Sequence, residues 1–247
     1  MNDQITRLCE LINTSKRIVF FGGAGVSTES GIPDFRSENG IFKAIEEYGY
    51  PPEELLSHTF FLRKPDIFFK YYKDLLLCTD AKPNEAHKAL AKLEQIGKLT
   101  AVITQNIDGL HQIASSKTVL ELHGSIYRNY CTKCHRFFDA EYVKNHSGIP
   151  YCPCGGMIKP DVVLYEEALD ENTITSALTH ILRADMLIVG GTSLQVYPAA
   201  CFVDYYSGDK MVLINRSTTS LDRRANLTIN GKIGEVLSSV MQLIDPA

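Results

Sequence analysis

The sequence predicts an α/β fold in which helices cover both faces of a parallel sheet. Four short apolar segments are expected as strands, at 18–21, 101–104, 186–189 and 211–214. A segment with helical character precedes each of them, at 4–15, 84–97, 171–184 and 198–206. Strands that are apolar throughout, rather than on one face, are typical of a parallel sheet that is buried on both sides.

The expected strands all end in polar stretches that contain glycine or asparagine. These stretches are 22–25, 105–108, 190–193 and Asn215. In doubly wound sheets, ligands bind beyond the carboxyl ends of the strands. We therefore expect the four stretches to surround one crevice.

Composition excludes several classes of protein. The chain has 247 residues, of which 45% are hydrophobic and 22% charged, as in ordinary globular proteins. Its net charge of −4 counts against a protein whose main task is to bind nucleic acid. No apolar run approaches the roughly 18 residues that span a bilayer, and residues 1–4 carry no basic region of a secretory signal. A cytoplasmic protein that binds neither nucleic acid nor membranes is expected.

The cysteines predict a metal site. Four of the seven lie close together, as Cys131-x-x-Cys134, seventeen intervening residues, and Cys152-x-Cys154. Two close pairs of thiolates suit one tetrahedral, structural zinc in a small ribbon, because four protein ligands leave no open position for water. The segment 125–160 has little apolar content, so a metal is expected to order it.

The cysteine pattern leaves alternatives to this metal site. The one-residue gap of the second pair needs a tight turn, for which Gly155-Gly156 supplies backbone freedom. His135 could replace one cysteine as a ligand, and a redox pair is a weaker alternative. Cys9, Cys78 and Cys201 are expected to be inert thiols.

A second segment, 53–79, also interrupts the alternation of strands and helices. It is helical in pattern and rich in aromatic residues, including Phe60, Phe61, Tyr71 and Tyr72. We expect a helical insert that packs its own small core; a ligand-binding box is the alternative.

The turn after the first strand has the features of a phosphate-binding turn. Backbone N–H groups at Gly23-Ala24-Gly25 can approach a pyrophosphate. The third glycine of the dehydrogenase fingerprint is replaced by Thr28, and Pro33 prevents a long helix after the turn. The glycines alone are therefore a weak signal for a nucleotide.

Longer motifs resemble those of the sirtuins, the NAD-dependent protein lysine deacylases. They are GAGVSTESGIPDFR at 23–36, TQNIDGLH at 104–111, ELHG at 121–124, GTSL at 191–194 and VYP at 196–198, with Asn215 after the next strand. The matches run in order along nearly the whole chain, and fourteen consecutive residues of the first motif match.

The resemblance implies a set of site residues. The expected contacts with NAD are Ala24, Thr28, Phe35, Arg36, Gln105, Ile107, Asp108, His123, Thr192, Ser193, Asn215 and Lys232. His123 and Asn106 are the expected catalytic residues, and Cys131, Cys134, Cys152 and Cys154 the expected zinc ligands.

Residue chemistry agrees with these roles on the phosphate side. Ala24 and Thr28 offer backbone donors and a hydroxyl to phosphate, and Arg36 can add charge-assisted hydrogen bonds. Phe35 has an aromatic face that can exclude water from the ribose carbon after nicotinamide leaves.

Residue chemistry also agrees on the nicotinamide side. Ile107 and Asp108 can hold a carboxamide, whose NH₂ group needs an acceptor. Gln105 and Asn106 can bind ribose hydroxyls and orient water. His123 is the best general base, because an imidazole titrates near neutral pH.

Ordinary structural roles compete with some of these assignments. Asp108 alone would be read as a helix cap before 109–111, and Phe35 alone as a core residue. The remaining histidines are expected to be structural or solvent-facing: His58, His87, His111, His146 and His180.

The segment KPDVVLYEE at 159–167 resembles the family segment that pairs with an extended substrate peptide. The family often has phenylalanine–glycine–glutamate at its end, where this chain has Tyr165-Glu166-Glu167. Members that prefer succinyl-lysine or malonyl-lysine carry a tyrosine and, three residues later, an arginine. Leu75 follows Tyr72 at that spacing, and Asp74 follows Tyr71, so acetyl-lysine is the expected substrate.

The function expected from the resemblance is that of an NAD-dependent protein lysine deacetylase of the compact bacterial and archaeal type. It acts on acetyl-lysine proteins or peptides and yields nicotinamide and O-acetyl-ADP-ribose. Mono-ADP-ribosyl transfer to protein is the alternative; a zinc-ribbon interaction module would explain only about 30 residues.

The expected fold is a Rossmann-like domain with a smaller domain that combines a zinc ribbon and the helical insert. The expected bounds are 1–52, 80–124 and 161–247 for the larger domain, and 53–79 and 125–160 for the smaller one.

Overall fold

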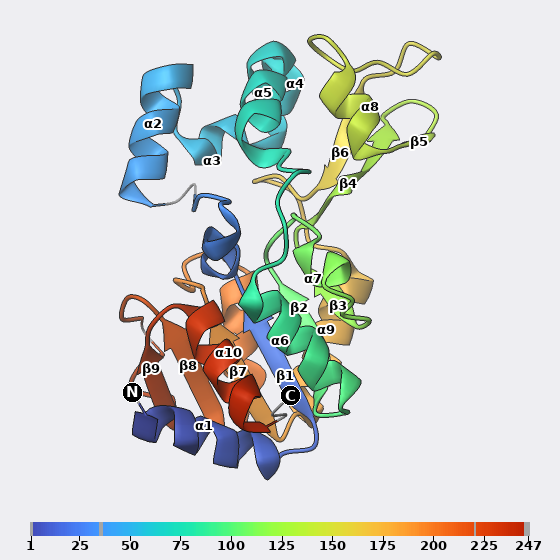
Figure 1. The fold of residues 1–247 in the computed structure, drawn as a ribbon. Coiled ribbons are helices and arrows are strands. Elements are labelled where there is room, and N and C mark those ends of the chain that lie inside the picture. The colour runs from blue at the N-terminus through green and yellow to red at the C-terminus, as the bar shows by residue number, and fades with distance from the viewer. Residues whose placement is uncertain (1, 35–36, 220, 245–247) are drawn as a thin grey trace.

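A computed structural model describes residues 2–34, 37–219 and 221–244. Its elements form two lobes (Figure 1), one around a six-stranded sheet and one around a three-stranded sheet. The large lobe comprises the six-stranded sheet with helices α1, α6, α7, α9 and α10, and the small lobe the three-stranded sheet with helices α2 to α5 and α8.

All neighbouring strands of the large sheet are parallel. In spatial order they are β3 (Val119–Glu121), β2 (Leu99–Thr104), β1 (Ile18–Gly22), β7 (Met186–Gly190), β8 (Met211–Asn215) and β9 (Leu227–Asn230). Its helices are α1 (Asn2–Asn13), α6 (Glu85–Gln95), α7 (Leu110–Ile113), α9 (Glu171–Arg183) and α10 (Ile233–Ile244).

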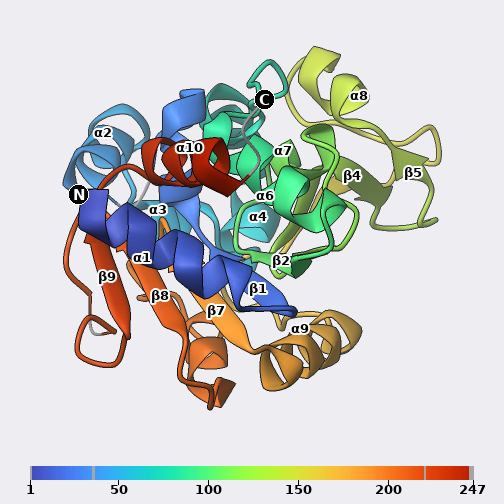
Figure 2. The same cartoon turned by 60° about the horizontal axis from the view of Figure 1, so that its bottom comes forward.

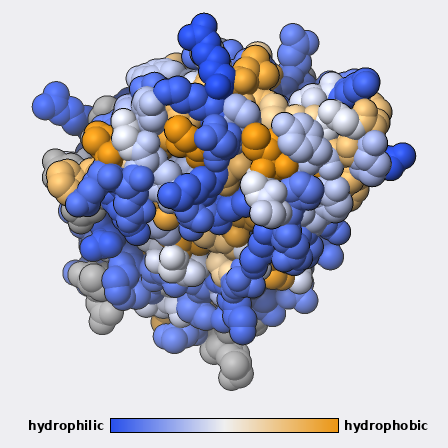
Figure 3. Space-filling view, turned by 90° about the horizontal axis from the view of Figure 1, so that it is seen from above, coloured by the Kyte–Doolittle hydropathy of each residue, from blue (hydrophilic) through white to orange (hydrophobic). Residues whose placement is uncertain are grey.

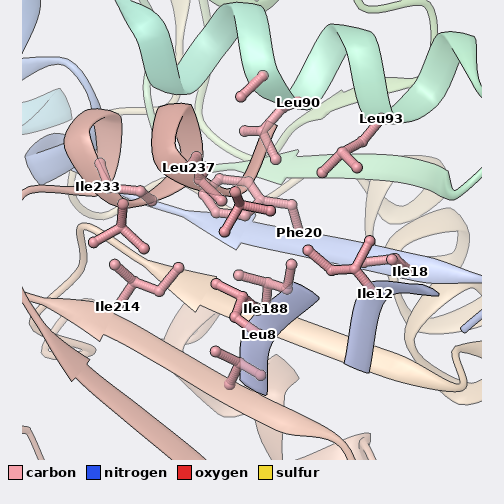
Figure 4. Close-up of a cluster of buried hydrophobic side chains, with 14 of the residues drawn as sticks. Leu8, Ile12, Ile18, Phe20, Leu90, Leu93, Ile188, Ile214, Ile233 and Leu237 are labelled. Atoms are coloured by element: carbon pink, nitrogen blue, oxygen red, sulfur yellow. The ribbon is translucent and has the colours of Figure 1, made fainter. Parts of the chain in front are cut away.

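Burial explains why the central segments are strands. Every residue of β1, β7 and β8 is buried, and alternate side chains point to opposite faces of the sheet. Phe20, Ile188 and Ile214 pack on one face against α1, α6 and α10 (Figure 4). Val19 and Phe21 pack on the other face with residues of α9. Figure 2 shows α1, α6 and α10 on one side of the sheet and α9 on the other.

The observed elements confirm the predicted α/β fold with its parallel sheet. The segment expected to be helical at 198–206 is a 3₁₀ helix, Ala199–Tyr205. Strands β3 and β9 extend the sheet at its two edges. Their burial is only partial, so they lack the continuous apolar pattern of the central strands.

The small lobe combines an antiparallel sheet with short helices. The sheet has the order β5 (Phe137–Phe138), β4 (Gly124–Cys131) and β6 (Ile158–Val162). The helices are α2 (Glu38–Tyr48), α3 (Pro52–Leu55), α4 (His58–Arg63), α5 (Pro65–Tyr71) and α8 (Ala140–Asn145). One π-helical turn, Tyr72–Leu76, follows α5.

The sequence predicted that the helical insert packs a small core of its own. This prediction is wrong. Its aromatic residues, including Phe68 and Tyr72, share one cluster with Ile126 and Ile158 of the three-stranded sheet. Helix α2 precedes the expected insert, and its Ala44 is buried in the same cluster. The aromatic side chains therefore join the helices to the ribbon, while the domain bounds given above remain a prediction.

The outer face of the small lobe is mixed in character. Figure 3 shows apolar residues in separate small patches among hydrophilic ones. Phe42 and Leu62 are among the exposed apolar side chains of this lobe. Among the described residues, no helix has the length and apolar character needed to cross a membrane.

Candidate active site

A cleft lies between the two lobes. From the large lobe it is lined by Ala24 and Ser27, by His123 and by the stretch 105–108 at the end of β2. From the small lobe it is lined by Pro52, Leu56, Leu76 and the segment 162–167. The polar ends of β1 and β2 therefore face a wall of the small lobe that is apolar except for the carboxylates of Glu166 and Glu167.

The glycine turn after β1 packs against the end of β7. Gly25 N–H donates to the Gly191 carbonyl at 2.7 Å, and a side chain on Gly25 would meet the Gly191 backbone at 2.8 Å. Gly191 has φ +60°, a conformation that favours glycine. The Thr28 hydroxyl donates to the Gly25 carbonyl at 3.0 Å and so stabilises the turn. This close backbone packing leaves Ala24 on the cleft wall.

Asn84, which the sequence analysis missed, holds this turn from behind. Its Nδ2 donates to the Val26 carbonyl at 2.7 Å and to Ser30 Oγ at 3.0 Å. It also caps α6, and its side chain contacts Nδ1 of His87. A cap residue is an ordinary feature of sequence, so nothing marked Asn84 as a residue that supports the cleft.

Ser27 links the turn after β1 to the stretch after β2. Its hydroxyl donates to Asp108 Oδ2 at 2.6 Å and accepts from Asn106 Nδ2 at 2.9 Å. Gln105 Nε2 in turn donates to Thr192 Oγ1 at 3.1 Å. The sequence analysis gave Ser27 no role, because its partners lie about eighty residues away along the chain.

Asp108 is a buried carboxyl group in the cleft wall. Burial raises the pKa of Asp108, while hydrogen bonds from Ser27 and from the Leu110 N–H act in the opposite direction. The Leu110 bond, at 2.9 Å, is the capping contact that the sequence suggested, although Gly109 occupies the N-cap position of α7. Asp108 therefore combines a structural contact with a place in the cleft.

His123 is oriented by the backbone. Its Nδ1 lies 2.8 Å from the Gln105 carbonyl oxygen, which can only accept, so Nδ1 carries a proton. In the neutral ring the basic lone pair is then on Nε2. The His123 carbonyl also accepts from Val163 N–H at 3.0 Å, which ties the histidine to the small lobe.

The chain crosses between the lobes next to His123. Gly124 has φ +76°, and a side chain there would lie 1.9 Å from the Asp161 carbonyl oxygen. Arg128 bridges the crossing, because it donates to Glu121 Oε2 and to Asp161 Oδ2, each at 2.7 Å. These contacts fix the position of His123 between the two sheets.

The remaining predicted cofactor residues lie in different environments. Asn215 holds Thr192 through two hydrogen bonds, from Thr192 N–H at 3.1 Å and to its carbonyl at 2.8 Å. Ser193 is exposed. Lys232 is also exposed, and its Nζ binds Glu235 at 2.7 Å rather than lining the cleft. Phe35 and Arg36 lie outside the described residues.

The wall formed by 162–167 is held by an ionic cluster around Glu167. Its carboxylate lies 2.7 Å from His58 Nδ1 and 3.0 Å from Lys159 Nζ, and it accepts from Leu164 N–H at 2.9 Å. Burial acts to raise the pKa of Glu167, but these three partners hold it below its usual range. His58, expected to be structural or solvent-facing, has a structural role here, because it supports the cleft wall.

The four predicted zinc ligands converge at the tip of the small lobe. The sulfur atoms of Cys131, Cys134, Cys152 and Cys154 lie within 4.8 Å of one another. Tetrahedral zinc with Zn–S distances of about 2.3 Å needs sulfur separations of roughly 3.8 Å. The Cys131–Cys154 and Cys134–Cys152 separations are 3.4 and 3.6 Å, so the set fits one zinc. His135 is not a member of the set.

The electrostatics of the cysteines also suit a cation. Burial raises the pKa of Cys131, but backbone N–H groups of Cys134 and Lys133 and neighbouring thiols lower it to about 6. The Cys154 N–H lowers the pKa of Cys152, yet burial and hydrogen bonds with the other three thiols raise it to about 12. A first thiolate thus forms readily, whereas further ionisation needs a compensating positive charge.

Fold and site together define a Rossmann-like protein with a zinc ribbon and a polar cleft between its lobes. The family model of the Sir2 family matches residues 23–198. A relative from Clostridium perfringens named "NAD-dependent protein deacetylase" is 57% identical over 98% of this chain and 100% of its own length. The chain therefore belongs to the Sir2 family.

Solved structures agree with this assignment. One described as "Sir2-p53 peptide-NAD+" has a TM-score of 0.86 and 38% identity, and covers 97% of this chain and 98% of its own. Another, a Sir2 protein with a deacetylated p53 peptide and 3′-O-acetyl ADP ribose, has a TM-score of 0.88 at 38% identity and the same coverage.

Proposed function

We propose that this chain is an NAD-dependent protein lysine deacetylase that releases nicotinamide and O-acetyl-ADP-ribose. One observation carries the proposal: His123, held by the Gln105 carbonyl, lines the same cleft as the polar stretch 105–108 and the wall 162–167. A base, a site for a polar cofactor and a wall for a peptide thus meet in one place. The names of the relatives and the described contents of the Sir2 structures support the same activity.

The residues of the cleft fit NAD. Ala24 lines the cleft at the glycine turn, where a pyrophosphate can lie, and the Thr28 hydroxyl would contact it by leaving the Gly25 carbonyl. When bound, NAD supplies the ribose carbon whose bond to nicotinamide breaks. The further proposed contacts are Phe35, Arg36, Thr192, Ser193, Asn215 and Lys232, the last of which must first leave Glu235.

Asp108 and Ile107 are proposed to hold the nicotinamide carboxamide. The Asp108 carboxyl is buried and accepts from Ser27, which in turn binds Asn106. This network fixes the direction of the carboxyl group before a ligand arrives. Gln105 is similarly held by Thr192, so both side chains can bind polar groups without losing further conformational freedom.

His123 is proposed as the general base. Because Nδ1 donates to the Gln105 carbonyl, Nε2 is the atom that can accept a proton from a ribose hydroxyl in the cleft. The positive charge that forms on the ring is stabilised by the same carbonyl. Asn106, bound to Ser27, is proposed to orient the reacting groups.

Zinc is proposed as a structural ion, since four cysteines satisfy its coordination. It would fix the loops next to β4 and β6, and β6 leads into the cleft wall at 162–167. Acetyl-lysine proteins or peptides are the proposed substrates, with no direct part for nucleic acid or membranes. Metal-binding thiolates suit a reducing compartment, and we propose the cytoplasm.

The test is an acetyl-lysine peptide assay with and without NAD, followed by nicotinamide release and peptide mass. We expect nicotinamide only with both NAD and the acetylated peptide, and loss of the acetyl mass. Addition of ADP-ribose to the peptide or the protein, without deacetylation, would instead show ADP-ribosyl transfer. The unacetylated peptide is the matched control.

A further inference from the structure

Glu166 has an unusual backbone conformation in the cleft wall. Its φ is +76°, a left-handed conformation that side chains disfavour and that glycine adopts without cost. This is the position at which the Sir2 family often has glycine, as the sequence analysis noted. The chain therefore places a carboxylate where the backbone itself favours glycine.

Contacts with helix α4 hold this carboxylate. Oε2 of Glu166 accepts from Thr59 N–H at 2.9 Å and from Thr59 Oγ1 at 2.7 Å. These hydrogen bonds lower the pKa of Glu166, and the positive potentials of His58 and Arg63 add to the effect. The side chain is exposed and is ionised at neutral pH.

Glu166 differs from the other acidic residues of the cleft. Among the described residues that line it, the carboxyl groups are Asp108, Glu166 and Glu167, and there is no lysine or arginine. Asp108 is buried, and Glu167 is paired with Lys159 and His58. Glu166 is thus the carboxylate of the lining that is exposed to an incoming peptide.

We propose that Glu166 is a specificity-determining residue that favours acetylated peptides with a lysine or arginine close to the acetyl-lysine. The inference rests on the proposed function and names a class of substrate for the same site. A peptide extended along 162–167 brings the side chains next to its acetyl-lysine close to this rim. A cationic side chain there meets Glu166, whereas an acidic one meets a like charge.

The test compares three acetyl-lysine peptides that differ only at the flanking positions, which carry lysine, alanine or glutamate. We expect kcat/KM to favour the lysine peptide over the glutamate peptide by roughly 5-fold at low salt, as for an exposed charge pair. The ratio should fall as ionic strength rises, because exposed charges are screened.

Two variants connect the preference to Glu166. Glu166→Gln removes the charge but keeps an amide oxygen for Thr59, and Glu166→Gly removes the side chain and relieves the backbone. In both, the ratio should fall to about 1 while KM for NAD stays unchanged. Glu85→Gln on α6, which is outside the cleft lining and paired with Lys88, is the matched control and should keep the wild-type ratio.

A wild-type enzyme without charge preference, or an unchanged ratio in Glu166→Gln, would overturn the proposal. Fluorescence anisotropy of the same peptides, labelled with a fluorophore, measures the charge preference as a difference in binding affinity and does not depend on turnover. Absence of nicotinamide release with every peptide would count against the proposed function instead, and the binding measurement would still decide the role of Glu166.

Discussion

The two lobes achieve order in different ways. In the large lobe, every residue of β1, β7 and β8 is buried between helices on both faces. In the small lobe, the whole stretch 132–137 is exposed, and the cysteines are divided, with Cys131 and Cys152 buried but Cys134 and Cys154 exposed. One zinc would therefore attach two exposed loops to a buried aromatic core.

This difference shows why the cleft lies where it does. The large lobe supplies a rigid edge, on which backbone contacts such as Gly25 to Gly191 fix the polar groups. The small lobe supplies the wall 162–167, whose position depends on β6 and on the ionic cluster around Glu167. A substitution, metal loss or change of pH that unfolds one lobe should thus leave the other lobe folded but still disrupt the cleft between them.

The largest expected effect is loss of the metal. Cys152→Ser should reduce zinc from about one ion per chain to almost none, because binding energy in such sites is folding energy. Amides of 131–157 should then exchange rapidly while those of β1, β7 and β8 stay protected, as hydrogen-exchange mass spectrometry can show. Cys201→Ser, outside the cluster, is the control. Full zinc content in Cys152→Ser would exclude this cysteine as a ligand.

The second largest effect is expected from removal of His123, the proposed general base. His123→Ala should lower deacetylation by roughly 10²–10⁴-fold, the usual scale for a lost general base, with NAD binding and zinc content maintained. Calorimetry with NAD and steady-state kinetics measure the two effects separately. His180→Ala on α9 should behave as wild type. Near wild-type turnover of a folded His123→Ala protein would remove His123 from the role of base.

Acid should act on the large lobe through a buried histidine pair. The rings of His87 and His111 lie 4.7 Å apart, and burial lowers the pKa of His87 to about 4 and that of His111 well below its usual value. Below about pH 6.5 the unfolded state therefore binds more protons than the folded state. The contribution of the two neutral histidines to the free energy of unfolding is present above about pH 6.5 and is lost as pH falls towards 4.

For His87 this loss is roughly 2 kcal/mol between pH 7 and pH 5, from the linkage relation. Urea unfolding at the two pH values measures it. His87→Asn keeps a polar side chain that can accept from the Asn84 N–H but does not titrate, so this variant should lose less stability with acid than the wild type. Parallel zinc analysis separates the effect from metal release. Equal losses in both proteins would contradict the pKa argument.

The smallest of these four effects concerns the acyl group. Acetyl-lysine should be preferred over succinyl-lysine by at least ~10-fold in kcat/KM, or ~1.4 kcal/mol. The described lining has no lysine or arginine, and Lys73 is held away from the cleft by the carbonyls of His146 and Gly148. Kinetics with matched peptides decide it, with propionyl-lysine as a neutral control for size. Equal succinyl turnover would reveal a cation in the cleft.

Sequence patterns predicted the parts of the molecule that depend on local chemistry. Continuous apolar runs located β1, β2, β7 and β8, and the spacing of the cysteines located the metal site. Contacts between distant segments left no such pattern, so the roles of Ser27 and Asn84 were missed. Sequence spacing drew attention to Leu75, whereas Leu76, the last residue of the π-helical turn Tyr72–Leu76, is the leucine of this turn that lines the cleft.

The central claim is that one cleft couples cleavage of NAD to removal of an acetyl group. The most direct measurement is the product balance in one reaction mixture, obtained by mass spectrometry with an acetyl-lysine peptide. We predict equal amounts of nicotinamide, deacetylated peptide and O-acetyl-ADP-ribose, and none of the three without NAD. Deacetylated peptide that forms without nicotinamide, or nicotinamide that forms without deacetylated peptide, would contradict the account.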